Sequence, residues 1–172
     1  SINIVILKTI KSKFLKLNNS FSNNLKILKK NIIITGANSG IGFNLVKILG
    51  KCENNILALV NYNDDEIISV KNENINIIKC NFSNPENINN YSDKIKNFKP
   101  SILINCAAIF GPENQNFNDI IIKEFNTIMN INVLAPLTLI QNSLKGKSLK
   151  QVVNISSLMG SMSNCNGDFY LY

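Results

Sequence analysis

The chain has 172 residues, of which 45% are hydrophobic and 17% are charged. This length and composition are typical of one globular domain and argue against a fibrous or disordered chain. The formal charge of +7 is concentrated in residues 1–30, which hold seven lysines and no acid, so the rest of the chain is neutral. A nucleic-acid-binding protein would spread positive charge over a binding face, and we therefore expect no nucleic-acid partner.

The chain has no histidine and no pair of cysteines spaced as CxxC, which argues against a metal site. Its cysteines are predicted to be buried, reduced thiols of a cytoplasmic protein. They are Cys52, Cys80, Cys106 and Cys165.

Residues 1–30 carry apolar side chains at steps of three and four with lysines between them, which predicts a basic amphipathic leader or tail. Three alternatives stay open for it: weak contact with an anionic membrane surface, a targeting peptide, or a tail that packs or stays loosely ordered. No apolar run reaches the ~18 residues that a membrane span needs.

From Asn31 onward, short apolar runs alternate with longer helical patterns, which predicts an α/β fold. The expected form is a Rossmann-type doubly wound parallel sheet in a three-layer αβα sandwich, formed by residues 31–172. Strands buried on both faces are predicted at Ile32–Thr35, Ile56–Val60, Ile75–Cys80, Ile102–Cys106 and Val152–Ser156. Helices are predicted near 40–50, 64–70, 85–97 and 119–145, with Ser83 or Asn84 and then Pro85 opening the third.

A glycine-rich stretch, TGANSGIG, directly follows the first predicted strand and opens the first predicted helix. Glycines there allow a tight turn and a close approach of the backbone to a diphosphate, while free N–H groups at the helix start attract the anion. The stretch therefore predicts a dinucleotide site that includes Thr35, Gly36, Asn38, Ser39, Gly40, Ile41 and Gly42.

With three residues between its first two glycines, TGANSGIG resembles the short-chain dehydrogenase/reductase family, in its single-domain branch. The resemblance runs from Asn31 to Tyr172 and looks closest to the C-factor-like carbonyl reductases. NCAA is similar to the family segment NNAG, NVLAP to the segment with a relay asparagine, and NISS to the segment with the catalytic serine. The resemblance implies that Asn132 holds a water and Ser157 polarises a carbonyl, and it places Asn81, Phe82, Asn105, Cys106 and Ala107 along the cofactor.

The family's catalytic tyrosine begins a YxxxK motif. Spacing from Ser157 favours Tyr170, thirteen residues later, but the FYLY ending resembles a Y-x-Y pattern whose second tyrosine is catalytic, so Tyr172 is preferred. A lysine one helical turn further lowers the tyrosine pKa. That lysine would be residue 176, so we expect the sequence to be a C-terminally truncated piece, inactive as it stands.

The resemblance implies an NAD(P)-dependent oxidoreductase that interconverts a small-molecule carbonyl and a secondary alcohol, and a homo-oligomer at full length. The alternative is a non-catalytic nucleotide-binding protein, a sensor or scaffold. An acid after the second strand selects NAD and an arginine there selects NADP. Here Asn61 and Tyr62 stand at that place, so the sequence leaves NAD or NADP undecided.

Overall fold

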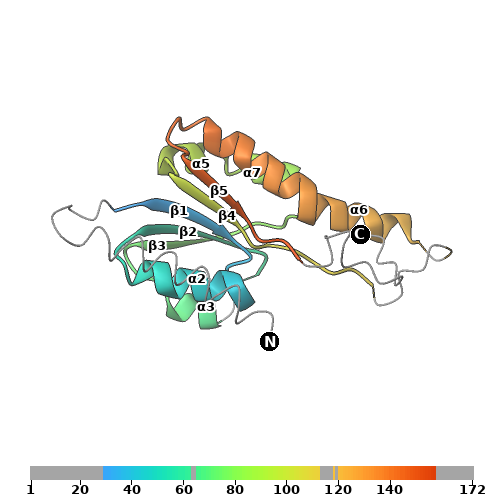
Figure 1. Ribbon diagram of the computed structural model, residues 1–172, viewed down its shortest axis with the longest axis horizontal. Helices are drawn as coiled ribbons and strands as arrows, with labels where there is room; N and C mark the ends of the chain where they lie inside the picture. Colours follow the sequence, from blue (N-terminus) through green and yellow to red (C-terminus); the bar gives the residue numbers. More distant parts are fainter. Residues whose placement is uncertain (1–28, 63–64, 113–117, 119, 158–172) are drawn as a thin grey trace.

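In the computed structural model, residues 29–62, 65–112, 118 and 120–157 are described, and they form a parallel sheet between two layers of helices (Figure 1). The five strands of this sheet lie in the order β3-β2-β1-β4-β5 and all pairs are parallel. In chain order the elements are β1 (Asn31–Thr35), α2 (Gly40–Gly50), β2 (Asn55–Val60), α3 (Asp65–Ser69), β3 (Ile75–Lys79), α4 (Glu86–Asn89), α5 (Ser92–Phe98), β4 (Ile102–Asn105), α6 (Ile122–Met129), η2 (Asn130–Leu134), α7 (Ala135–Leu144) and β5 (Gln151–Asn154).

The predicted fold class is confirmed. After β1 the chain crosses outward to β2 and β3, and it then returns past β1 to β4 and β5. The direction reverses between β1 and β4, and doubly wound sheets bind their ligands beyond the carboxyl ends of the strands at such a reversal. The rod formed by α6, η2 and α7 extends past those carboxyl ends (Figure 1).

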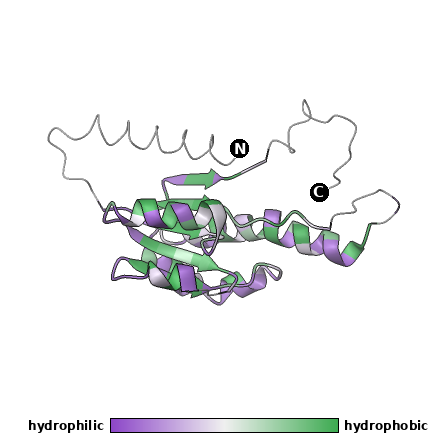
Figure 2. Ribbon diagram, turned by 90° about the horizontal axis from the view of Figure 1, so that it is seen from below, coloured by the Kyte–Doolittle hydropathy of each residue, from purple (hydrophilic) through white to green (hydrophobic). Residues whose placement is uncertain are grey.

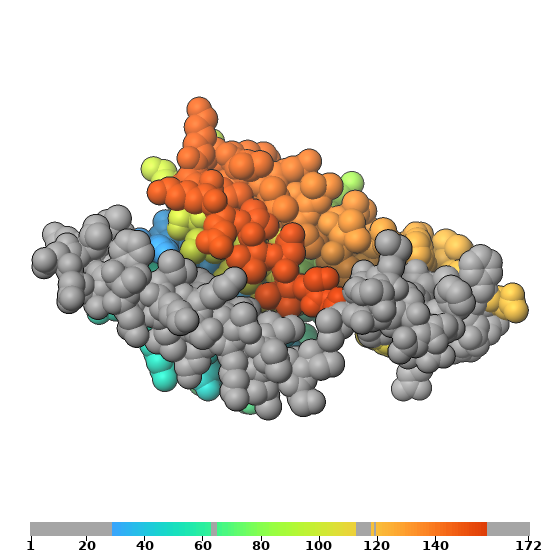
Figure 3. Space-filling model, in the orientation of Figure 1, coloured from blue at the N-terminus to red at the C-terminus, as the bar shows by residue number. Residues whose placement is uncertain are grey.

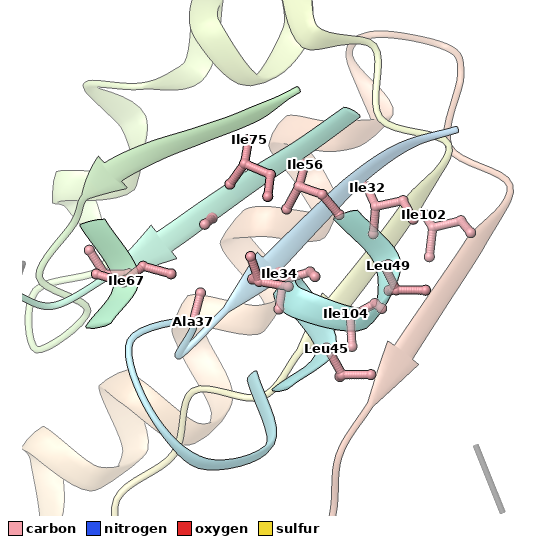
Figure 4. Packing of buried hydrophobic residues seen from close by; sticks show 13 residues of the cluster. Ile32, Ile34, Ala37, Leu45, Leu49, Ile56, Ile67, Ile75, Ile102 and Ile104 are labelled. Carbon is pink, nitrogen blue, oxygen red and sulfur yellow. The ribbon is translucent and has the colours of Figure 1, made fainter. Parts of the chain in front are cut away.

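Two core clusters, one on each face of the sheet, hold the layers together. The first core cluster lies against α2 and α3 and includes Ile32, Ile34, Val46 and Ile67 (Figure 4). The second core cluster lies against α4, α5 and α7. Alternate residues of a strand point to opposite faces, so the middle positions of the central strands, which are covered on both faces, are apolar (Figure 2). The members of the second core cluster are Ile33, Leu57, Leu59, Ile78, Cys80, Phe82, Ile88, Ile95, Leu103, Ala135 and Leu139.

The two outer strands of the described sheet differ from the prediction. β5 ends at Asn154 rather than Ser156, and its Val152 and Val153 are only half-buried. It pairs with β4 alone among the described strands, and Figure 3 shows it at the surface. β3 also exposes two residues, Asn76 and Lys79. An outer strand has a neighbour on one side only, so continuous burial was the wrong expectation for both.

The helix predicted over 85–97 is in fact two helices, α4 and α5, separated at Asn90 and Tyr91. The amide oxygen of Asn84 accepts a hydrogen bond from the N–H of Glu86 at 3.0 Å, and α4 begins there. The hydroxyl of Tyr91 donates to the carbonyl of Lys79 at 2.8 Å. This bond ties the junction between the two helices to the end of β3, and each helix contributes one isoleucine, Ile88 or Ile95, to the second core cluster.

The helix predicted over 119–145 begins at Ile122 and contains the π-helical turn η2. The turn directly precedes α7, whose second residue is Pro136. Proline has no N–H to give to the preceding turn, and π-helical turns commonly form where the regular ladder is interrupted.

The predictions for the cysteines and for the ends of the chain have different outcomes. Cys80 is buried as predicted, whereas Cys106 is only half-buried and Cys52, in the turn after α2, is exposed. Residues 1–28, Cys165, Tyr170 and Tyr172 lie outside the described residues, so the basic leader and the burial of Cys165 stay predictions. Among the described helices, none is long and apolar enough to cross a membrane.

Candidate functional site

The turn between β1 and α2 has the backbone shape of an anion-binding loop. Gly36 and Gly40 adopt left-handed φ angles of 61° and 53°. A Cβ added to Gly42 would lie 2.2 Å from the carbonyl oxygen of Gly36, so only glycine lets helix and strand approach this closely. A Cβ added to Gly40 would meet no atom within 4 Å. The backbone at Gly40 therefore borders open space that a ligand can enter.

The start of α2 also suits an anion. Ser39 is extended, with φ −154° and ψ 170°, and its side chain does not cap the helix. The first turn contains no acidic residue. The first N–H groups of a helix have no intrahelical partner, and the helix dipole adds positive charge at this end. The N–H groups of Gly40 and Ile41, with the buried Asn38 beside them, thus fit the diphosphate of a dinucleotide.

Thr35 joins this loop to the segment after β4. Its side-chain oxygen accepts hydrogen bonds from the N–H groups of Cys106, at 3.0 Å, and Ala107, at 2.9 Å. A Cβ on Gly36 would lie 2.9 Å from the Cα of Ala107, so the two backbones touch. Sequence reasoning placed Thr35 in the glycine loop but missed these two hydrogen bonds, whose partners lie 71 and 72 positions further along the chain.

Asn105, the last residue of β4, is 5% exposed, and its amide nitrogen donates to the amide oxygen of Asn154 at 2.8 Å. The two residues are partners in the register of β4 and β5. Within the described part of the chain, the amide oxygen of Asn105 is buried without a hydrogen-bond partner. The pair fixes the carboxyl end of β5, and Asn154 was not among the predicted site residues.

Asn132 lies in η2 and holds the loop after β4. Its amide oxygen accepts from the N–H of Ile109 and its amide nitrogen donates to the carbonyl of Ile109, both at 2.9 Å. In the same turn, Asn130 donates to the carbonyl of Ser83 at 2.7 Å. The only sequence signal for these hydrogen bonds was the presence of Asn130 and Asn132 shortly before Pro136. These two bonds of Asn132 use one of the two lone pairs of the amide oxygen and one of the two hydrogens of the amide nitrogen, so the amide can still bind a water.

The thiol of Cys106 packs against the first core cluster. Burial raises its pKa from 9.0 to about 12. Burial likewise raises the pKa of Cys80 to about 11. Both groups therefore stay protonated at neutral pH, and a protonated thiol is a poor nucleophile. The cysteine of NCAA contributes backbone contacts to this site rather than covalent chemistry.

The ends of β2 and β3 border the same edge. Asn61 and Tyr62 follow β2 and are exposed. The amide oxygen of Asn81, after β3, accepts from the N–H of Ser83 at 2.9 Å and so shapes its own turn. The side chain of Phe82 is 6% exposed and packs in the second core cluster, so the predicted cofactor contact of this residue stays a prediction for its backbone. Only its backbone is left for a cofactor.

Two of the three predicted catalytic residues are described, and both lie beyond the carboxyl ends of the strands. Ser157 is exposed and follows β5 by three residues. The N–H of Ile155 donates to the carbonyl of Asn105 at 2.9 Å, which keeps the segment before Ser157 against β4. Tyr172 lies outside the described residues. The structure thus gathers the glycine loop, the segment after β4, η2 and the end of β5 at one edge.

Comparison with known proteins gives a family match over most of the chain. The family model described as short chain dehydrogenase matches residues 30–171. The 3-oxoacyl-[acyl-carrier-protein] reductase FabG of Buchnera aphidicola subsp. Baizongia pistaciae is 30% identical over 157 residues, which are 85% of this chain and 62% of the relative. FabG of Rickettsia prowazekii is 29% identical over 142 residues, 78% of this chain and 56% of the relative. The chain thus spans little more than half the length of these relatives.

Solved structures of dehydrogenases are also similar to this chain. A short chain dehydrogenase of Leptospira borgpetersenii with bound NAD+ has a TM-score of 0.69 at 25% identity, over 80% of this chain and 57% of that one. A 4-hydroxyisoleucine dehydrogenase complexed with NADH has a TM-score of 0.64 at 28% identity, over 75% of this chain and 56% of that one.

Proposed function

Because the chain belongs to the short-chain dehydrogenase/reductase family, whose cofactor is NAD or NADP, we propose that its protein is an oxidoreductase that interconverts a carbonyl and a secondary alcohol. The observation that carries the proposal is the turn between β1 and α2. Its glycines leave open space at Gly40 and no room for a side chain at Gly42, as a bound diphosphate requires.

In this proposal the glycine loop holds the diphosphate, with N–H groups at the start of α2 as donors. The segment Asn105–Ala107 forms a wall beside it, fixed by the bonds to Thr35. When bound, the nicotinamide ring supplies or accepts the hydride. Asn132 positions the loop after β4 through its two bonds to Ile109.

The proton chemistry is assigned to residues around the end of β5. The hydroxyl of Ser157 holds the substrate oxygen, and Tyr172 gives or takes the proton. A free tyrosine has a pKa of about 10, so it needs a nearby cation to exchange a proton near neutral pH. A lysine at position 176, one helical turn beyond Tyr172, would supply that charge.

The substrate is a small-molecule carbonyl or alcohol, and the protein works in the cytoplasm. The relatives named as 3-oxoacyl-[acyl-carrier-protein] reductases make a 3-oxoacyl thioester the first substrate to try. The loop after β4 offers an apolar border, because Ile109 and Phe110 are exposed there.

The protein also forms a homo-oligomer, with the outer face of η2 and α7 as the interface. This outer face consists of Val133, Leu134, Leu137 and Leu144, all exposed. The sequence between Glu124 and Lys145 contains no charged residue. A surface helix normally turns charged residues to water, so a second apolar surface is the expected cover.

The test combines binding with turnover. The chain is titrated with NADH and NADPH, and the gene is sequenced beyond the codon of Tyr172. The protein that this gene encodes is then assayed for consumption of NADH or NADPH in the presence of ketones and of a 3-oxoacyl thioester. We expect the chain to bind NADH or NADPH and the gene to encode a lysine at position 176. The encoded protein should turn over substrate, and Tyr172→Phe should abolish that turnover. Binding without turnover in that protein would instead leave the non-catalytic sensor or scaffold function.

A further inference from the structure

The corner beyond β2 lies next to the glycine loop. The N–H of Ala37 donates to the carbonyl of Leu59 at 3.3 Å, which holds the loop against the end of β2. Asn61 and Tyr62 follow directly and are exposed. In dinucleotide-binding folds, the side chain at this place meets the 2′ position of the adenosine ribose, which is a hydroxyl in NAD and a phosphate in NADP.

The charges described around this corner are unfavourable for a 2′-phosphate. Asp65 and Glu66 occupy the first turn of α3 and are exposed. Ile67 fixes this short helix, since it is fully buried in the first core cluster with Val60. The acids are therefore held near the end of β2 by packing.

Among the described residues, lysines offset little of this negative charge. Lys47 lies two turns into α2, with its ammonium 5.2 Å from the centre of the Phe43 ring. Lys79 ends β3 and is paired in register with Val60, so it is the lysine that strand pairing brings closest to this corner. Ser39 and Asn38, in the glycine loop, are uncharged.

From this arrangement we infer that the protein binds NAD(H) in preference to NADP(H), with Asn61 as the partner of the 2′-hydroxyl. The inference rests on the proposed function, which puts the diphosphate in the glycine loop. A side-chain amide carries both a donor and an acceptor, so it pairs with a hydroxyl without needing charge. A phosphate monoester carries a charge of about −1.5 to −2, which Asp65 and Glu66 repel and no arginine offsets.

The experiment measures binding to the 172-residue chain without catalysis. NADH and NADPH are titrated by fluorescence anisotropy, and 5′-AMP and 2′,5′-ADP by calorimetry, because these fragments report on the adenosine end alone. NADH is expected to bind roughly tenfold or more tightly than NADPH, with the same order for the fragments. Added salt should narrow the gap, because it screens the repulsion.

Two variants sharpen the test. Asn61→Arg should bring NADPH level with NADH or ahead of it, whereas Lys79→Met should leave the ratio unchanged. Equal or tighter binding of NADPH by the unaltered chain would overturn the preference alone and leave the proposed function standing. A selective loss of NADPH binding in Lys79→Met would overturn the assigned cause of the preference, by showing that Lys79 receives the phosphate. Failure of both dinucleotides to bind would overturn the proposed function and the preference with it.

Discussion

The side chain of Asn132 forms two hydrogen bonds with the backbone of Ile109, accepting from its N–H and donating to its carbonyl, each at 2.9 Å. The π-helical turn in the long helix carries Asn132 to this place. The loop that follows β4 is thereby tied to a helix 23 residues further along the chain. Asn132 thus acts as a positioning residue for the candidate site.

Removing this side chain should cost stability. Asn132→Ala is expected to lower the free energy of unfolding by ~1–2 kcal/mol, because two backbone groups lose their partner in a half-exposed setting. Asn132→Asp keeps the acceptor and should recover part of the loss. Urea unfolding measures both, with Asn126→Ala on the exposed face of α6 as the control. Helix propensity alone makes Asn→Ala slightly stabilising, so an equal loss in the control would show that the loss in Asn132→Ala does not come from the bonds to Ile109.

Gly42→Ala should abolish nucleotide binding. The new Cβ would lie 2.2 Å from the carbonyl oxygen of Gly36, so the backbone of the loop must move, at a cost of about 3 kcal/mol. The matched control is Gly50→Ala at the other end of α2, where the Cβ would meet the flexible end of Ile75 at 2.8 Å. Titration with NADH and urea unfolding test both variants. Unchanged NADH affinity in Gly42→Ala would refute the close packing of helix and strand.

Thr35→Val should release the segment after β4. The N–H groups of Cys106 and Ala107 would lose their shared acceptor in a partly buried place, which should cost ~2–4 kcal/mol. Thr35→Ser keeps the hydroxyl and is expected to retain most of the stability. Hydrogen exchange at the two amides gives a local readout. Unchanged protection of both amides in the valine variant would contradict the geometry.

The stability of the chain should fall at high pH because burial raises the pKa of the Cys80 and Cys106 thiols. A thiol whose pKa is higher in the folded chain than in the unfolded chain holds its proton more tightly when folded. The stabilising contribution of such a thiol is therefore complete below pH 9.0, the ordinary pKa. It is lost as the pH rises through the folded-state pKa, which is about 11 for Cys80 and about 12 for Cys106.

Urea unfolding between pH 8 and pH 11 measures this loss, and the variant Cys80→Ala/Cys106→Ala is the control for lysine and tyrosine titration. The double variant should show a flatter pH profile. Identical profiles for the two proteins would mean that the thiols are not desolvated.

Leu137→Lys should dissociate the proposed homo-oligomer. Leu137 is 50% exposed on the outer face of α7, and a charge there would have to be desolvated in an interface. Sedimentation velocity is expected to show a monomer. The control is Ile68→Lys on α3, where the wild-type side chain is 51% exposed on the other side of the sheet. An oligomer that survives Leu137→Lys would move the interface elsewhere.

Much of the fold could be predicted from the sequence because its signals are local. Continuous apolar runs marked β1, β2 and β4, since a central parallel strand is covered on both faces. The TGANSGIG stretch was recognisable because glycine is needed wherever φ is positive or backbones touch. The break at Tyr91 and the half-exposed β5 escaped prediction, because they depend on neighbours distant in sequence.

The sequence by itself thus determined the order of elements, the glycine loop and the residues that carry the resemblance to the family. Only the tertiary structure decided what those residues touch. It revealed that Thr35 holds Cys106 and Ala107, that Asn132 holds Ile109, and that Phe82 belongs to the core. The physical reason is that hydrogen bonds and burial join groups over 20 to 70 residues apart in the chain, and their register is set only when the layers pack.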